Sequence, residues 1–502
     1  MKYRSTRGGV EGVSFVDAVL MGLAPDRGLL VPEVVPSVSA AMLAEWKKIG
    51  SFEELAFEIM SLYISREEIS AEELRNLTKG AYASFRSPEV TPVVDLSGMG
   101  TCEEPNVYLL ELFHGPTFAF KDVALQFLGR LFELILKKKE ARGETSKTLT
   151  IVGATSGDTG SSAIYGVRGR ENVECFILYP EGRTSKIQEA QMATVPDENV
   201  HAIAVANAEF DDCQKIVKGL FGDETFRERH SLGAVNSINW ARILAQITYY
   251  FWAAFKLDKK EVWFSVPTGN FGDVLAGYYA KIMGCPLGKL LVATNDNDIL
   301  CKFFETGVYK RQEGGATPTL APSMDICVSS NFERFLFHCA SDNSTTCRDL
   351  MANFETHNSF QADKQLFDLA KTHMRAHSVD EKAILSTISQ WYTETGYVLD
   401  PHTACGVAAG LKLRPDASTT LVCLACAHHA KFPDAVEKAI GKANLANLQP
   451  KETALTDLLD LPLRNVTLQN DIRAVADFID TTMQKKQHKA ISSPDKKKSK
   501  SS

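Results

Sequence analysis

Two stretches rich in glycine and hydroxyl side chains each follow a run of β-branched residues, and both are suited to an anion. Residues 148–160 read Thr-Leu-Thr-Ile-Val-Gly-Ala-Thr-Ser-Gly-Asp-Thr-Gly, and residues 262–273 read Val-Trp-Phe-Ser-Val-Pro-Thr-Gly-Asn-Phe-Gly-Asp. Where a strand ends and a helix begins, the first helical amides are unpaired and the helix dipole favours negative charge. We therefore expect an anion at each turn.

The two turns suit different anions. In the second turn, Gly269 and Gly272 let the backbone close on a phosphate monoester without obstruction by a Cβ atom. Neither turn is a Walker loop, and no Gly-x-Gly-x-x-Gly follows a predicted strand, so the pattern disfavours ATP and dinucleotides. The first turn offers hydroxyls and amides to a carboxylate from Thr155, Ser156, Gly157, Asp158 and Thr159.

A lysine follows an aromatic run ahead of both turns. Residues 111–122 read Glu-Leu-Phe-His-Gly-Pro-Thr-Phe-Ala-Phe-Lys-Asp, and Lys121 opens a helical pattern over 123–136. Desolvation lowers the proton affinity of such a lysine and makes its amine nucleophilic towards an aldehyde. A lone lysine at a helix start more often extends to water. Together with a phosphate turn and a carboxylate turn, however, a reactive lysine indicates a pyridoxal-phosphate enzyme that acts on an amino acid.

The run His114-Gly-Pro-Thr-Phe-Ala-Phe-Lys-Asp122 closely resembles the cofactor-lysine motif of the threonine synthase family, a family of fold type II pyridoxal-phosphate enzymes. The resemblance continues in one order from residue 2 to about residue 440, and the whole is similar to the long fungal type. The other motifs that carry it are Ser5-Thr-Arg-Gly8, Ala24-Pro-Asp-Arg-Gly-Leu29, Ser156-Gly-Asp-Thr-Gly160, Asn239-Trp-Ala-Arg242, Pro267-Thr-Gly-Asn-Phe-Gly-Asp273, Ala293-Thr-Asn-Asp-Asn-Asp298, Ser329-Ser-Asn-Phe-Glu-Arg334 and Asp400-Pro-His-Thr403.

The resemblance implies conversion of O-phosphohomoserine and water to threonine and phosphate, the last step of threonine biosynthesis. Pyridoxal 5'-phosphate would form a Schiff base with Lys121, which would also move the substrate protons. Arg242 with Asn239 would bind the leaving phosphate, because a guanidinium meets phosphate bidentately, although a structural Arg242 remains open. The substrate carboxylate would lie on the turn of residues 155–159. The residues implied for the cofactor phosphate are Gly269, Asn270, Phe271, Gly272 and Asp273.

One segment departs from the family pattern. Family members usually carry Ser-Thr-Ala-His-Pro-Ala-Lys-Phe where residues 425–432 read Ala-Cys-Ala-His-His-Ala-Lys-Phe. Cys426 thus stands where a threonine hydroxyl contacts the pyridine nitrogen, and His429 replaces the proline. A thiol, like a hydroxyl, cannot hold that nitrogen protonated as a carboxylate would. Two alternatives stay open: a phospho-lyase that releases a 2-oxo acid and ammonia from a phosphorylated hydroxyamino acid, and a catalytically silent relative.

Two further patterns resemble metal motifs. Cys423 and Cys426 form a Cys-x-x-Cys, but a zinc site needs a second, well-separated pair, so we expect no metal. His373 and His377 have i, i+4 spacing on an expected helix and lack the glutamate of a zincin, so we expect exposed helix histidines.

The pattern of apolar residues predicts an α/β protein with mostly parallel sheets and a helical N-terminal region. The resemblance implies fold type II, similar to the β subunit of tryptophan synthase. We expect a helical domain over 1–95 and catalytic α/β domains over 96–450, with a smaller sheet domain inserted at roughly 120–240. A helical segment over 451–483 and a disordered Lys/Ser tail over 484–502 should follow. Strands are predicted at 107–112, 148–152, 173–179, 262–266, 289–294 and 419–424.

The composition and net charge of the chain argue against several classes of function. The chain has 502 residues, a formal net charge of -7 and a pI near 5.9, which argue against a surface for nucleic acid. No stretch approaches 18 uncharged apolar residues and no signal peptide is evident, so we expect no membrane partner and a cytoplasmic location. The eleven cysteines are expected to be thiols. A monomer or homodimer with a small-molecule substrate fits these features.

Overall fold

The computed structural model describes residues 1–144, 148–448 and 453–492, and its centre is a six-stranded sheet. The strand order is β13-β10-β9-β14-β4-β3. Only β3 runs antiparallel to its neighbour among these strands. The strands are β3 Val93–Asp95, β4 Val107–Glu111, β9 Val262–Pro267, β10 Leu287–Thr294, β13 Met374–Ser378 and β14 Leu421–Ala425.

Successive residues of a strand face opposite sides of the sheet, and here the two sides have separate hydrophobic cores. Val422 and Leu424 pack with residues of α10 and α11, whereas Leu421 and Cys423 pack with residues of α17. Both faces are therefore covered, as expected for a mostly parallel sheet. The helices are α10 Trp240–Leu257, α11 Gly272–Met283 and α17 Pro401–Leu413.

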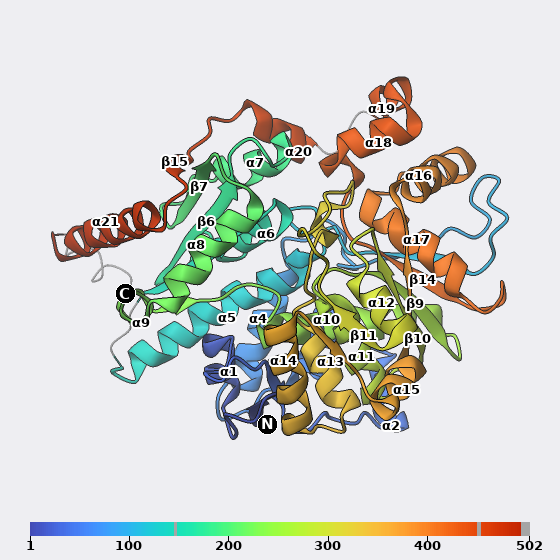
Figure 1. Ribbon diagram of the computed structural model, residues 1–502, viewed down its shortest axis with the longest axis horizontal. Helices are drawn as coiled ribbons and strands as arrows, with labels where there is room; N and C mark the ends of the chain where they lie inside the picture. The colour runs from blue at the N-terminus through green and yellow to red at the C-terminus, as the bar shows by residue number, and fades with distance from the viewer. Residues whose placement is uncertain (145–147, 449–452, 493–502) are drawn as a thin grey trace.

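A second sheet of five parallel strands lies beside the first; in Figure 1 its strands β6 and β7 are green and its edge strand β15 is red. Its order is β15-β7-β6-β5-β8, and every residue of β6 is buried. Its strands are β5 Leu149–Ala154, β6 Val173–Pro180, β7 Val200–Ala206, β8 Leu232–Gly233 and β15 Val466–Gln469. Its helices are α6 Asp158–Val167, α7 Lys186–Ala193, α8 Phe210–Gly222 and α9 Glu224–His230.

The N-terminal region consists of amphipathic helices and a two-stranded antiparallel sheet, β1-β2. Ser70 and Glu73 form a capping box that starts α4. The buried faces of α3 and α4 pack against α10 and α5 respectively. The elements are β1 Tyr3–Ser5, α1 Phe15–Met21, β2 Leu30–Pro32, α2 Ala40–Trp46, α3 Phe52–Ser61 and α4 Ala71–Tyr82.

The rest of the chain flanks the large sheet and then returns to the small one. The segment between β10 and β13 contains α12 Ile299–Thr306, β11 Val308–Lys310, the 3-10 turn Pro322–Met324, α13 Phe332–Cys339, α14 Ser344–His357, β12 Ser359–Gln361 and α15 Lys364–His373. The later elements are α16 Glu381–Thr395, the 3-10 turn His429–Lys431, α18 Pro433–Ile440, α19 Lys442–Asn447, α20 Thr453–Thr456, the 3-10 turn Asp457–Asp460 and α21 Ile472–Ser492.

Helix α5 (Lys121–Ala141) connects the two sheets and packs directly on α6. The two helix backbones approach so closely that a side chain would not fit. A Cβ atom on Gly129 would lie 1.9 Å from the carbonyl oxygen of Gly166, and one on Gly166 would lie 2.4 Å from that of Leu125. These glycines therefore set how α5 lies against the small sheet.

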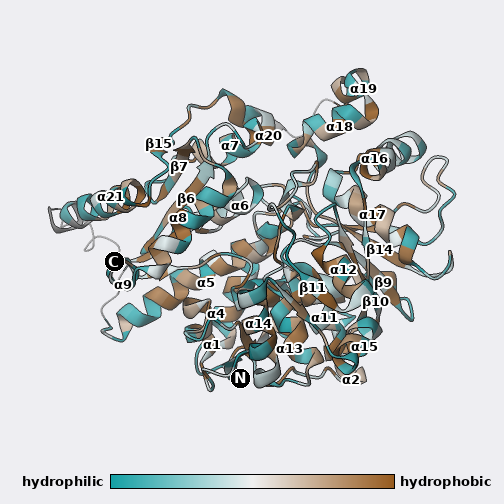
Figure 2. Ribbon diagram, viewed as in Figure 1, coloured by the Kyte–Doolittle hydropathy of each residue, from teal (hydrophilic) through white to brown (hydrophobic). Residues whose placement is uncertain are grey.

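The prediction of a disordered tail from residue 484 is wrong for residues 484–492, which belong to α21. Val475, Ile479 and Met483 recur every four residues and are buried against the small sheet. Lys486 Nζ donates to both carboxylate oxygens of Glu174, at 2.6 Å each. Hydrophilic and hydrophobic residues interleave along α21 in Figure 2, as in a helix with one buried face. The tail residues 493–502 lie outside the described part.

Two other expectations differ from the structure. His377 lies in strand β13, parallel to β10, and His373 ends α15, so the two histidines do not share a helix. A pair at i, i+4 is too little to indicate a helix when the intervening residues pair with a sheet. The segment 451–483 also contains β15, which the prediction of helix alone missed. The six predicted strands are all present, with bounds shifted by two residues or fewer.

Among the described residues, no helix combines the length and apolar content needed to cross a bilayer.

We expect Gly129→Ala to lower the free energy of unfolding by about 1–3 kcal/mol, because its methyl group must displace the backbone of α6. Chemical denaturation followed by circular dichroism measures this. Gly50→Ala is the matched control, since a Cβ atom there would meet nothing within 4 Å. Equal stability of the two variants would show that α5 and α6 are not held at this contact.

Candidate active site

Lys121 is the first residue of α5, and its side chain is buried with 8% exposure. The chain before it crosses the end of β14: the Phe120 amide donates to the Cys426 carbonyl at 2.7 Å, and the His428 amide donates to the Phe118 carbonyl at 3.1 Å. Lys121 and Cys426, which are far apart in sequence, are therefore neighbours. The lysine Nζ lies 3.5 Å from the Ser323 hydroxyl.

The surroundings of Lys121 favour an unprotonated amine. Burial lowers the pKa of Lys121, and the positive charges of Lys431 and Arg242 lower it further, whereas the Asp158 carboxylate acts in the opposite direction. A buried amine with a lowered pKa is the form that attacks an aldehyde. These features suit the nucleophile role that the sequence predicts for Lys121, which stays a prediction.

The turn between β5 and α6 is organised by a threonine. The Thr155 hydroxyl accepts hydrogen bonds from the amides of Gly157 and Gly160, at 2.9 and 2.8 Å. Gly157 has φ +146°, and a Cβ atom there would meet the Gln188 side chain, so the turn requires glycine. Ser156 and Thr159 remain partly exposed. Thr155 thus shapes the turn, while the partly exposed residues remain for a ligand.

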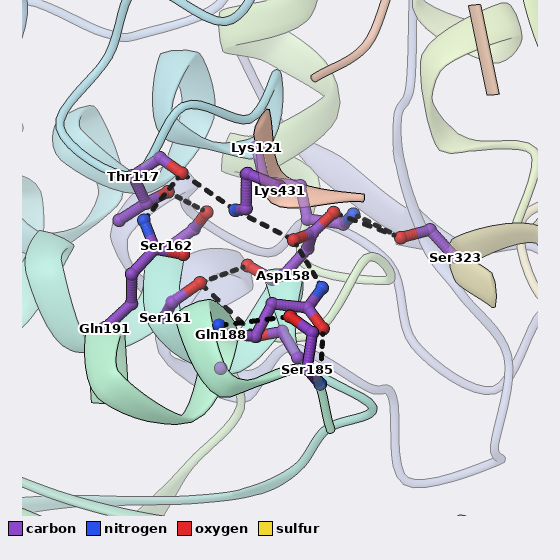
Figure 3. A network of polar contacts seen from close by, with 12 residues as sticks. Thr117, Lys121, Asp158, Ser161, Ser162, Ser185, Gln188, Gln191, Ser323 and Lys431 are labelled. Atoms are coloured by element: carbon purple, nitrogen blue, oxygen red, sulfur yellow. Dashed lines mark hydrogen bonds and ion pairs between the residues drawn. The ribbon is translucent and has the colours of Figure 1, made fainter. Parts of the chain in front are cut away.

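The Asp158 side chain does not suit the predicted role in holding a substrate carboxylate. Its oxygens accept hydrogen bonds from Lys431 Nζ at 2.8 Å, Gln188 Nε2 at 2.9 Å and Ser323 Oγ at 3.3 Å (Figure 3). Burial alone would raise the pKa of Asp158, but the charges of Lys431 and Lys121 outweigh burial and hold it well below the usual value. An ionised carboxylate repels another carboxylate, so only the backbone of this residue could serve the predicted role.

The turn between β9 and α11 presents free amides. Phe271 adopts a left-handed conformation with φ +63°, and α11 begins at Gly272. The neighbouring segment supports the turn, because the Asn331 side chain and amide donate to the Asn270 carbonyl at 3.0 and 3.1 Å. Within the described chain, no hydrogen bond joins the amides of residues 269–272 to another protein group. These amides at a helix start are suited to a phosphate.

The Asp273 side chain differs from the predicted phosphate contact. Its Oδ1 accepts hydrogen bonds from the hydroxyls of Tyr249 and Tyr250, at 2.5 and 2.8 Å, and its Oδ2 is buried without a partner among the described residues. Burial raises the pKa of Asp273 to about 6, although the two tyrosines act to lower it. A buried carboxylate does not attract phosphate, so the side chain belongs to the support of α11.

Arg242 is a buried cation that forms no ion pair with any residue that the structure describes. Its side chain is 3% exposed, and Nη1 donates to the Val235 carbonyl at 3.1 Å. Its Nε has no partner, and no carboxylate lies within 4.0 Å, in the part of the chain that the structure describes. Burial lowers the pKa of Arg242 to about 10. An unpaired buried guanidinium is costly unless a ligand anion neutralises it.

The side chain of Asn239 differs from the prediction that it binds the leaving phosphate together with Arg242. Its side-chain amide donates to the carbonyls of Val19 and Ala234, at 2.9 and 3.2 Å, and its Oδ1 accepts from the Ala241 amide. Both donor hydrogens are thus used within the protein. Asn239 caps α10 and fixes Arg242 in its first turn rather than contacting a ligand.

Comparison with known proteins decides the family. Three protein-family models match the chain: "Threonine synthase N terminus" over residues 2–82, "Pyridoxal-phosphate dependent enzyme" over 86–427 and "Threonine synthase, C-terminal" over 403–479. The threonine synthase of Saccharomyces cerevisiae is 49% identical over 463 residues, which cover 87% of this chain and 89% of the relative.

The chain belongs to the threonine synthase family. The crystal structure of yeast threonine synthase superposes with a TM-score of 0.90 at 45% identity and covers 96% of this chain and 99% of that one. The pyridoxal-phosphate-bound threonine synthase of Brucella melitensis gives a TM-score of 0.88 at 40% identity, with the same coverage. The protein is thus a pyridoxal-phosphate-dependent enzyme of fold type II, as predicted.

Cys426, the residue that departs from the threonine synthase pattern, is held rigidly. Its amide donates to the Thr403 hydroxyl at 3.1 Å, and that hydroxyl donates in turn to Asp400. Burial raises the pKa of the Cys426 thiol well above its usual value, and the nearby Asp400 and Asp273 act in the same direction. Cys426 is therefore a neutral thiol, as chemically mild as the hydroxyl that it replaces. Among the described residues, no group of three or more His, Cys, Asp and Glu side chains could hold a metal ion.

Sequence reasoning missed three residues of this site. Ser323 lies in an irregular segment and carries no recognisable signal. Its amide donates to His402 Nε2 at 3.1 Å, and His402 Nδ1 lies 2.8 Å from Asp400. Lys431 is fully buried beside Asp158. The available signals were the motif Asp400-Pro-His-Thr403 for His402 and the run 425–432 for Lys431.

We expect the stability difference between Asp273→Asn and the wild type to depend on pH. The native pKa of about 6 exceeds the usual value, so the folded protein binds the proton more tightly than the unfolded chain does. Wild-type stability should then fall as pH rises from about 4 to about 6, by up to about 3 kcal/mol. The asparagine variant does not titrate and still accepts from both tyrosines.

Denaturation of both proteins between pH 4 and pH 8 measures this difference. The free energy of unfolding of the variant should rise relative to that of the wild type between pH 4 and about pH 6. Above that range the difference should stay constant. Asp477→Asn, at an exposed position of α21, is the control without such a trend. A difference that stays constant with pH would contradict burial as the cause of the raised pKa.

Proposed function

We propose that this protein converts O-phospho-L-homoserine and water to L-threonine and phosphate. The observation that carries the proposal is the buried Arg242 guanidinium, which lies near the amine of Lys121 and forms no ion pair with a described residue. A threonine synthase must combine an aldehyde-reactive lysine with a site for a phosphate that the substrate brings and the reaction releases. O-phospho-L-homoserine has a carboxylate at one end and a phosphate at the other, and the chain offers a separate group for each of these anions.

The residues fit pyridoxal 5'-phosphate. Lys121 would bind its aldehyde carbon, the amides of Gly269 to Gly272 would bind its phosphate, and the Cys426 thiol would face its ring nitrogen. When bound, the cofactor withdraws electrons from the substrate and acidifies the hydrogen on the amino-bearing carbon. The partnerless amides and the lowered pKa of Lys121 support this placement.

The remaining chemistry is assigned to protein groups. Ser156 and Thr159, with the amides of their turn, hold the substrate carboxylate. Arg242 binds the γ-phosphate and stabilises the negative charge that grows as this group leaves. Lys121 Nζ would take one proton from Cα and one from Cβ and would return one to Cγ and one to Cα, while water supplies the hydroxyl at Cβ and its remaining proton goes to the leaving phosphate. Among the described residues, Lys121 is buried and forms no ion pair, which suits this role.

We also propose that the enzyme works in the cytoplasm as a monomer or homodimer, without a nucleic-acid partner. The acidic net charge of -7 supports the last point.

Product analysis tests the function. The purified protein with added pyridoxal phosphate is incubated with O-phosphohomoserine, and threonine, 2-oxobutyrate and phosphate are quantified. We expect threonine and phosphate in equal amounts. A product mixture of 2-oxobutyrate, ammonia and phosphate without threonine would instead favour the phospho-lyase, and no turnover would favour a silent relative.

Arg242→Met should lower kcat/KM for O-phosphohomoserine by about 100-fold, since a charge-assisted bidentate contact worth about 3 kcal/mol is lost. Inorganic phosphate should also inhibit this variant more weakly than the wild type, and Arg242→Lys should lie between the two. Steady-state kinetics with phosphate as inhibitor make the measurement. If Arg242 is only structural, thermal stability will fall while the phosphate inhibition constant stays unchanged.

A further inference from the structure

A single buried carboxylate lies between two buried lysines. Lys431 Nζ contacts Asp158 Oδ1 at 2.8 Å, and both side chains are almost completely enclosed. Lys121 Nζ reaches the same carboxylate only through the Ser323 hydroxyl, which lies 3.5 Å from the lysine and 3.3 Å from Asp158 Oδ2. In Figure 3 the two lysines approach Asp158 from different chain segments. The carboxylate is thus bound to the lysine that is not the nucleophile.

The ion pair is held in place from both sides. Lys431 also donates to the Thr117 carbonyl at 2.8 Å, which links it to the segment just before Lys121. Gln188 donates to Asp158, and Gln188 itself forms a capping box with Ser185 at the start of α7. Two independent anchors therefore determine which lysine the carboxylate meets.

We propose that Lys431 is a positioning residue that binds the Asp158 carboxylate and so keeps the Lys121 amine free of an ion pair. A buried carboxylate that loses its partner must find another cation, because leaving it unpaired costs several kcal/mol. Without Lys431, the remaining lysine beside Asp158 is Lys121. That lysine would then hold a proton in order to pair with the carboxylate, and a protonated amine cannot attack an aldehyde.

The charges around Lys121 give the direction of each change. Removing the Lys431 cation leaves an uncompensated anion and raises the proton affinity of Lys121, whereas removing the Asp158 carboxylate leaves an extra cation and lowers it. Removing both charges together should leave the proton affinity of Lys121 nearly unchanged, because the two effects are opposite. The ionisable groups that act on Lys121 are Asp158 of α6, Lys431 of the 3-10 turn, Arg242 of α10, Asp273 of α11 and Cys426 after β14.

Four variants of the full-length protein test the inference: Lys431→Met, Lys431→Arg, Asp158→Asn and the double variant Lys431→Met/Asp158→Asn. The readout is the visible absorbance of the Lys121 Schiff base with pyridoxal phosphate, titrated from low to high pH, together with the dissociation constant of the cofactor. Lys438→Met is the matched control, at an exposed position of α18.

Lys431→Met should raise the pH midpoint of Schiff-base formation by about one unit and weaken cofactor binding about tenfold at neutral pH. Asp158→Asn should lower the midpoint, and both the double variant and Lys431→Arg should lie near the wild type. An unchanged midpoint in Lys431→Met, or a double variant shifted as far as that single variant, would overturn the inference. If Lys431→Met does not fold, two results still test the inference. The pH midpoint of Asp158→Asn should be lower than that of the wild type, and the midpoint of the double variant should return to the wild-type value.

This inference rests on the proposed cofactor lysine but not on the proposed substrate. A wild-type protein that forms the Schiff base and makes no threonine would contradict the proposed function, and the midpoints of the variants would still test the role of Lys431.

Discussion

The backbone contact between α5 and α6 constrains everything else in the molecule. Lys121 begins α5 at the end of the large sheet, and Asp158 begins α6 at the end of a small-sheet strand. Glycines at 129 and 166 let the two helices touch backbone to backbone. The helix starts, and the two groups that they carry, are therefore fixed relative to each other. The site is assembled at the junction of two sheets, and this contact sets the geometry of the junction.

The buried charged groups at that junction differ in whether they are ion-paired. Among the described residues at this junction, Lys431 pairs with Asp158, whereas Arg242 has no carboxylate partner and is the group that we propose for phosphate. Lys121 forms no ion pair with any described residue, and its Nζ lies 3.5 Å from the Ser323 hydroxyl and 4.7 Å from the centre of the Phe120 ring. An enzyme that binds a doubly anionic substrate needs positive charge, yet its nucleophile must stay neutral. Pairing one lysine and leaving the other unpaired meets both requirements within one buried volume.

Much of the fold and part of the site could be predicted from the sequence. The strands were evident because β-branched runs alternate with helical stretches, and Lys121 was evident because a motif surrounds it. The predictions that failed concerned the direction in which side chains point. Asp158, Asp273 and Asn239 lie in the right motifs, but their polar atoms face protein partners that are distant in sequence, such as Lys431 and Tyr249. Local spacing does not encode such contacts, and it also could not reveal that α21 finds a packing face through Val475 and Ile479.

Strand β15 has a consequence for how the protein is made. It covers the edge of β7, but four of the six strands of the large sheet, β9, β10, β13 and β14, come between β7 and β15 in the chain. While the chain is being synthesised, the small sheet therefore has an open edge, which is a template for pairing with other chains. Only when the last segment emerges can β15 close that edge and α21 cover the adjoining apolar face. The nascent protein is thus most vulnerable to aggregation at the sheet that carries the Asp158 turn, and completion of the chain ends that exposure.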